Sequence, residues 1–204
     1  MARIQNVDYE AIPGQAAQIR QIGQELNQEL TTAYSNIANM HSVWYGKRYN
    51  SLVGEFNKIV PQINELLQLV IGDFPMTLEI IANNYSQADT GANVTSPQIT
   101  APNKIAGILL SVDVGMRFLT SEVQNIQSQV SSNLDNAKAK MDQIQSVYNQ
   151  IQWQSEASET FKAKFTKLKL QITESFENIK SQFTKLMNQT QEDIQSAESS
   201  NTVG

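Results

Sequence analysis

The amino-acid sequence predicts an all-α protein in which two long helical hairpins pack as an elongated four-helix bundle. Apolar residues recur at intervals of three, four and seven over most of the 204 residues, which is the spacing of a helix with one buried face. The stripes are interrupted at two tryptophan-containing segments and at a polar stretch near the middle of the chain. The two halves also repeat each other, which predicts two copies of one helical unit.

The repeat aligns the chain with itself at a shift of 109 residues, with no gap. Apolar residues then lie over apolar residues along most of each hairpin. The matched pairs are Trp44 with Trp153, Leu52 with Phe161, Phe56 with Phe165, Ile63 with Ile172, Leu67 with Phe176, Val70 with Ile179, Phe74 with Phe183 and Leu78 with Met187. Because a lone two-helix hairpin cannot cover its own apolar stripe, the duplication favours a bundle in which each copy buries the other.

We assign residues 1–89 to the first hairpin. After a polar lead-in that closes at Pro13-Gly14, the spacing predicts a helix from Gln15 to about Ser42 and another from about Lys47 to Asp89. Gly46, between them, can take the positive φ that lets the chain reverse. Gly23 permits close approach of a neighbouring helix.

Pro61 and Pro75 interrupt the second of these helices. The apolar phase continues across both prolines, so we predict kinks at these positions. The segment 72–75, Gly-Asp-Phe-Pro, is the stronger candidate for a true break.

Residues 90–103 form a predicted linker, and residues 104–204 form the second hairpin. This hairpin has predicted helices from about Lys104 to Gln152 and from about Glu156 to Ser199. A helix of about forty residues spans about 60 Å, whereas about fourteen extended residues reach only about 50 Å. Head-to-tail packing within one chain therefore requires helix ends to unwind and lengthen the linker. The alternative is that the hairpins pair between two molecules.

Composition excludes several functions. The net charge of -5 disfavours nucleic-acid binding and binding to anionic membrane surfaces, since both need a basic face. There is no cysteine, and the single histidine, His41, has no neighbour in sequence with which to hold a metal or act as a catalytic base. No motif in the sequence indicates a cofactor. The N-terminus shows no apolar core of a cleavable signal peptide, and no apolar run is long enough to span a bilayer.

Trp44, Gly46, Tyr85 and Asp89 carry a resemblance to a known family. A Trp-X-Gly bend followed by Tyr-x-x-x-Asp near the end of the hairpin resembles the WxG family of small proteins exported by type VII secretion systems. The second bend, Trp153-Gln154-Ser155, has serine in place of the glycine.

In the tail of the second hairpin Ile194 takes the place of the tyrosine, and Glu198 retains the acid. The second hairpin thus resembles a degenerate member of the WxG family.

The resemblance implies that Tyr85 and Asp89, one helical turn apart, form an export signal together with a tryptophan bend brought alongside. In a head-to-tail bundle that bend belongs to the other hairpin, which places Trp153 near Tyr85. The alternative is structural: Tyr85 completes the apolar stripe, Asp89 is solvated, and Trp44 plugs one end of the bundle.

The leading functional hypothesis is a non-enzymatic protein that a type VII system secretes without a cleavable signal peptide and that acts by protein binding. The implied partner is a component of the secretion machinery, with another WxG-type protein or a second copy as further candidates. One alternative is a pore-forming or membrane-inserting toxin component with Ala106 to Leu119 as the inserting segment, although Asp113 and Arg117 oppose insertion. Another is a cytoplasmic adaptor or chaperone for exported partners.

Overall fold

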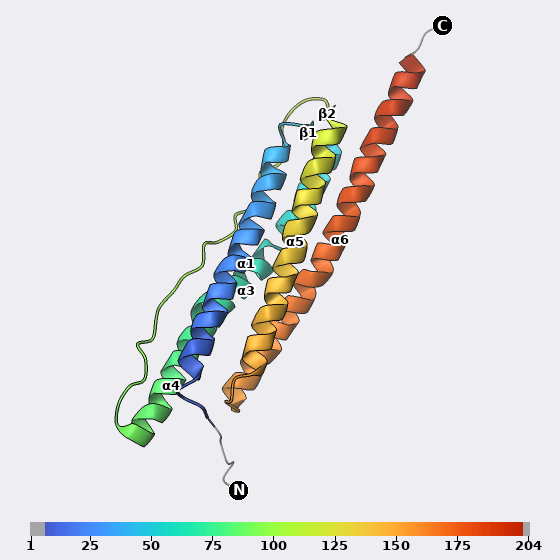
Figure 1. Cartoon of the computed structure of the whole chain (residues 1–204). Helices are drawn as coiled ribbons and strands as arrows, with labels where there is room; N and C mark the ends of the chain where they lie inside the picture. Colours follow the sequence, from blue (N-terminus) through green and yellow to red (C-terminus); the bar gives the residue numbers. More distant parts are fainter. Residues whose placement is uncertain (1–6, 202–204) are drawn as a thin grey trace.

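The computed structural model describes residues 7–201. The first half of the chain forms one long helix and a second, segmented helical arm, and these pack beside two long helices from the second half (Figure 1). The elements are α1 (Ile12–Met40), β1 (Trp44–Tyr45), α2 (Lys47–Lys58), α3 (Val60–Leu67), the π-helical turn η1 (Gln68–Asp73), α4 (Phe74–Thr90), β2 (Arg117–Phe118), α5 (Thr120–Asn149) and α6 (Glu156–Asn201). The prediction of an all-α helical bundle is confirmed, with only a two-stranded pairing of β1 and β2 added.

The core lies between the two hairpins. α1 packs along α5, and α2 and α3 pack against α6. Leu26 and Leu30 of α1 and Met141 and Ile144 of α5 are fully or almost fully buried, as expected if each copy covers the apolar stripe of the other. At the rim of this seam, Lys140 Nζ lies 2.5 Å from Glu25 Oε2, and this hydrogen bond lowers the pKa of Glu25.

The second arm of the first hairpin, from α2 to α4, stays helical past both prolines, as predicted. Pro61 and Pro75 each lie in the first turn of a new segment, α3 and α4, where no backbone donor is required. The segment 72–75, expected as the stronger break, instead spans the end of the π-helical turn η1 and the start of α4, and the Phe74 N–H bonds to the Leu69 carbonyl five residues back. The π-helical turn accommodates the irregular backbone, so the helical arm continues directly into α4.

Gly23 lies directly against this π-helical turn. A Cβ added to Gly23 would stand 2.8 Å from Cγ1 of Ile71 and 3.1 Å from Cγ2 of Val70. The missing side chain therefore lets α1 and η1 approach each other closely.

We expect Gly23→Ala to lower the free energy of unfolding by about 1–2 kcal/mol, because overpacking costs more than the gain in helix propensity of about 1 kcal/mol. Gly14→Ala is the matched control, since nothing lies within 4 Å of a Cβ built at Gly14, in the first turn of the same helix. Urea denaturation of both variants checks the prediction. A stabilised Gly23→Ala protein would contradict it.

The helix predicted from Lys104 is wrong at its start, because α5 begins only at Thr120. Residues 92–116, here called the strap, are extended and run along the bundle from the end of α4 to the Trp44 bend (Figure 1). Unwinding of the expected first turns thus lengthens the predicted 90–103 linker, which is one of the two geometries that the sequence left open. The segment 106–119, the inserting piece under the toxin alternative, is not helical.

Candidate functional site

Trp44 closes one end of the bundle. α1 ends at Met40, and after a short turn Trp44 and Tyr45 pair antiparallel with Phe118 and Arg117. The Trp44 side chain is 1% exposed. Its ring stacks on Phe183 of α6 at a centroid separation of 6.0 Å and meets Phe118 edge-on at 5.5 Å. The indole is therefore a packing element that joins both hairpins and β2, which follows the strap.

Gly46 caps the start of α2 with φ of 122°, a conformation that L side chains rarely adopt. A Cβ at this position would also stand 3.4 Å from the carbonyl oxygen of Gly115 in the strap. Gly46 is needed both for the reversal of the chain and for close approach of the strap, and the sequence predicted only the first of these roles.

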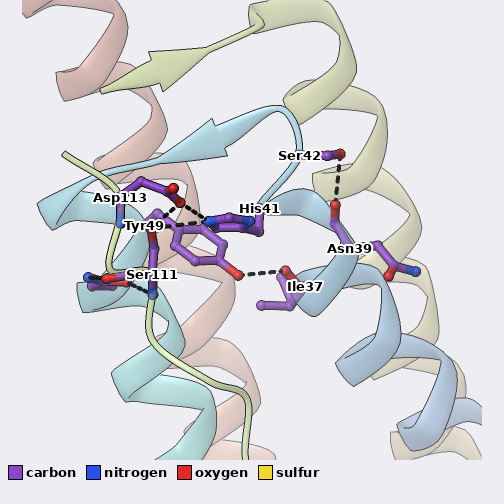
Figure 2. A network of polar contacts seen from close by, with 8 residues as sticks. Ile37, Asn39, His41, Ser42, Tyr49, Ser111 and Asp113 are labelled. Carbon is purple, nitrogen blue, oxygen red and sulfur yellow. Dashed lines mark hydrogen bonds and ion pairs between the residues drawn. The ribbon is translucent and has the colours of Figure 1, made fainter. Parts of the chain in front are cut away.

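Two tyrosines near this bend fasten α1 and α2 reciprocally. Tyr34 of α1 donates to the Phe56 carbonyl at 2.6 Å, and Tyr49 of α2 donates to the Ile37 carbonyl at 3.2 Å (Figure 2 shows the second bond). Ile37 lies in the last turn of α1, where helical carbonyls lack intrahelical partners, so Tyr49 satisfies one of them. Burial raises the pKa of both tyrosines.

Because their folded-state pKa values lie above the ordinary 10.0, neutral Tyr34 and Tyr49 stabilise the fold fully below that pH. We expect this contribution to be lost as the pH rises past 10.0, so that stability falls on the alkaline side. Tyrosinate absorbance during an alkaline titration, compared with Tyr34→Phe, checks this. The variant keeps the ring, should lose about 1 kcal/mol of stability, and should show one late-ionising tyrosine fewer. Identical titration curves would contradict the prediction.

His41, Ser111 and Asp113 form a polar network where the strap meets the bend (Figure 2). His41 Nε2 lies 2.5 Å from Asp113 Oδ2 and 3.1 Å from Ser111 Oγ, and Ser111 Oγ donates to Asp113 Oδ2 at 2.9 Å. The Ser111 hydroxyl, and then His41, lower the pKa of Asp113. A Ser-His-Asp catalytic triad uses one imidazole nitrogen for each partner. Here one nitrogen faces both, so the network anchors the strap and sets up no proton relay.

Tyr85 and Asp89 lie on the last turns of α4, at the opposite end of the molecule from Trp44 (Figure 1). Tyr85 is half-buried and Asp89 is exposed. Asp89 accepts a hydrogen bond from the hydroxyl of Tyr9, which precedes α1, and this bond raises the pKa of Tyr9. Asp89 therefore ties the start of the first hairpin to its end, a contact that the sequence did not predict.

The second bend, residues 150–155, lies at this same end of the bundle (Figure 1). Gln15 at the start of α1 donates to the Gln150 carbonyl at 3.4 Å. Trp153 is buried, at 5% exposure. The head-to-tail arrangement thus brings the second bend to the end that carries Tyr85 and Asp89.

Ser155 replaces the glycine of the motif and has a distinct structural role. Its Oγ accepts the Ser158 N–H at 3.2 Å, and the Ser158 Oγ accepts the Ser155 N–H at 3.1 Å. This reciprocal pair is a capping box at the start of α6. The described part of the chain has no non-glycine residue with positive φ, so the second bend starts its helix by serine capping where the first uses Gly46.

The end of the bundle at Trp44 has the equivalent arrangement, with the tail of the second hairpin beside the first bend. α6 passes the Trp44 bend, and Arg48 Nη1 lies 2.6 Å from Asp193 Oδ2 near the C-terminus of α6. Ile194 and Glu198, the counterparts of Tyr85 and Asp89, are carried on this last stretch of α6. Each tryptophan bend is therefore at the end of the bundle that holds the tail of the other hairpin.

Within residues 7–201 no group of three or more His, Asp and Glu side chains is placed to hold a metal ion. None of the helices described there is long and apolar enough to cross a bilayer.

The geometry defines a class of protein: an all-α bundle of helical hairpins, with a buried tryptophan at each of its two bends. Comparison with known families then gives a closer assignment. Residues 5–90 match the WXG100 family, described as proteins of 100 residues with WXG, and the match spans Trp44, Gly46, Tyr85 and Asp89. The match covers the first hairpin and supports its assignment to the WxG family. No curated protein and no solved structure matches the chain significantly. The WXG100 family is associated with substrates of type VII secretion systems.

Proposed function

We propose that the chain is a non-enzymatic substrate of a type VII secretion system, exported as a folded single-chain pseudo-dimer and acting outside the cell by protein binding. The observation that carries the proposal is the family match over residues 5–90. Burial of the first hairpin's apolar stripe by α5 and α6 supports the pseudo-dimer, because the second hairpin occupies the place of a separate partner. Export then requires no second chain to complete the fold.

In this proposal Tyr85 and Asp89 form the export signal, with the Trp153 bend at the same end of the bundle. A component of the secretion machinery is the partner that reads them. The asymmetry between the two hairpins supports a single working signal, since Ile194 cannot replace the hydroxyl of a tyrosine and Ser155 serves as a helix cap.

The test is secretion of Tyr85→Ala and Asp89→Ala proteins, measured as the fraction in the medium against the fraction in cells. We expect both to stay in the cells while thermal unfolding shows them folded. Tyr9→Phe is the matched control, because it removes the hydrogen bond to Asp89 and leaves the motif intact. Secretion of folded Tyr85→Ala and Asp89→Ala at the normal level would overturn the proposal. Retention of Tyr9→Phe would instead assign Asp89 a structural role.

A further inference from the structure

Three asparagines of the first hairpin hold the strap by its main chain. Asn50 and Asn57 of α2 and Asn64 of α3, here called the asparagine ladder, are seven residues apart. Each side-chain amide accepts the N–H and donates to the carbonyl of one strap residue. The pairs are Asn64 with Ile105 at 2.8 and 2.9 Å, Asn57 with Ile108 at 2.7 and 2.8 Å, and Asn50 with Ser111 at 2.8 and 2.9 Å.

The register of the ladder follows from the dimensions of the two backbones. Seven residues of helix rise about 10.5 Å, and three residues of extended chain span about 10 Å. Asparagines at heptad spacing therefore meet every third residue of an extended polypeptide. Because each rung uses only the N–H and carbonyl of its partner, the ladder recognises a main chain that any residue except proline provides.

Side chains add a modest requirement to this main-chain recognition. Ile105 and Ile108 turn inward and are 5% and 8% exposed, whereas Leu109 and Val112 are 88% and 94% exposed. A Cβ at Gly107 would stand 3.4 Å from Oδ1 of Asn57. The ladder thus suits an extended segment with two apolar residues three apart and glycine before the second.

The main chain of the strap is held by side chains of the first hairpin, as the main chain of a bound peptide would be. Within the described chain, residues 92–116 make no hydrogen bond to another main-chain group. Their attachment relies on side chains. The Asn83 amide also donates to the Thr95 carbonyl and accepts the Thr95 N–H, and Glu79 accepts the Gln98 N–H. Displacing residues 104–112 would expose Ile105 and Ile108, and an incoming main chain would restore the same hydrogen bonds.

The repeat shows that the ladder is not needed to build such a hairpin. At the shift of 109, Asn50, Asn57 and Asn64 correspond to glutamate and two threonines, at positions 159, 166 and 173. The second hairpin packs without an equivalent of the ladder, so packing of the bundle does not explain the three asparagines.

We propose that the asparagine ladder is a binding site for extended polypeptide. Residues 104–112 fill it in the closed molecule, and a partner segment of the same chemistry, with apolar residues three apart and glycine before the second, replaces them in trans. The strap is then a built-in competitor that keeps the site covered until such a partner is present. This inference concerns the surface of the first hairpin and is independent of export.

The experiment uses the full chain with Ile105→Pro, Ile108→Pro and Ser111→Pro, which removes the three N–H groups that the ladder accepts. A labelled peptide of residues 102–113 is added, and its fluorescence anisotropy is measured. We expect this open variant to bind the peptide about tenfold more tightly than the natural chain. Asn57→Leu, similar in shape but unable to bond, should reduce the affinity of the open variant by about the same factor.

Peptides methylated on a single backbone nitrogen are the sharpest control. Methylation at Ile108 removes a bonded N–H and should weaken binding about tenfold, whereas methylation at Leu109 should have little effect. Equal binding of the two methylated peptides, or no binding to a folded open variant, overturns the proposal.

A second measurement serves if the open variant does not fold. Excess peptide added to the natural chain should displace the strap and accelerate hydrogen exchange of the Ile108 amide. An unchanged exchange rate at saturating peptide overturns the proposal.

Discussion

Trp44→Ala is expected to lower the free energy of unfolding by about 3–5 kcal/mol, because it removes a fully buried aromatic side chain. Its ring contacts come from three separate segments, Tyr49 of α2, Phe118 of β2 and Phe183 of α6. No single neighbour can move to refill the cavity without releasing the other contacts. In thermal unfolding this corresponds to a fall in Tm of roughly 10 °C for a chain of this size.

Two further variants test whether the loss of stability in Trp44→Ala comes from the aromatic contacts of Trp44. Trp44→Phe keeps part of the stacking on Phe183 and should lose less than Trp44→Ala. Tyr45→Ala, in the same strand, removes a half-buried ring from the adjacent position and should have a clearly smaller effect. If Trp44→Ala were no more damaging than Tyr45→Ala, Trp44 would not be the element that joins the two hairpins at this end.

The sequence predicted the bundle because helical periodicity depends on local spacing. Apolar residues at intervals of three and four point to one face of a helix whatever they pack against. Repetition of the stripe in the second half then identified its partner surface. The bends were found for a similar reason, since a tryptophan between two stripes marks the place where the pattern stops.

The same periodicity misplaced the start of α5. Ile105, Ile108 and Val112 are spaced by three and four, as in a helix. In the structure the first two are buried because every third residue of the extended strap faces the asparagine ladder, and Val112 is almost fully exposed. A period of three in extended chain and 3.6 in helix cannot be separated over so few residues. The heptad spacing of Asn50, Asn57 and Asn64 was the signal that could have identified the strap's partner.

Contacts between distant residues at the candidate site were beyond sequence reasoning. The hydrogen bond from Tyr9 to Asp89 and the contact of His41 with Asp113 each join residues at least 70 positions apart. Such pairs are set by how the helices align along the bundle, and neither partner carries a local pattern that names the other. The predicted pair Tyr85 and Asp89 could be proposed only because both lie on one helix.

The buried ion pair between Arg20 of α1 and Glu79 of α4 is the second site where a large effect is expected. Arg20 Nη2 lies 2.9 Å from Glu79 Oε1, and the two side chains are 8% and 5% exposed. The Nη2 group is not aligned for a hydrogen bond, so charge attraction carries the contact. The other oxygen, Oε2, accepts the Gln98 N–H of the strap at 2.7 Å.

Glu79→Ala should lower the free energy of unfolding by about 3–5 kcal/mol, because it leaves the Arg20 guanidinium buried without a counter-charge. Glu79→Gln should resemble Glu79→Ala more than the natural chain, since a neutral amide keeps an acceptor for Gln98 but supplies no charge. The double variant Arg20→Met with Glu79→Met should recover most of the loss, because well-packed apolar side chains replace a buried ion pair at little cost. Chemical denaturation of the single and double variants measures the coupling. Additive losses would show that the two charges do not depend on each other.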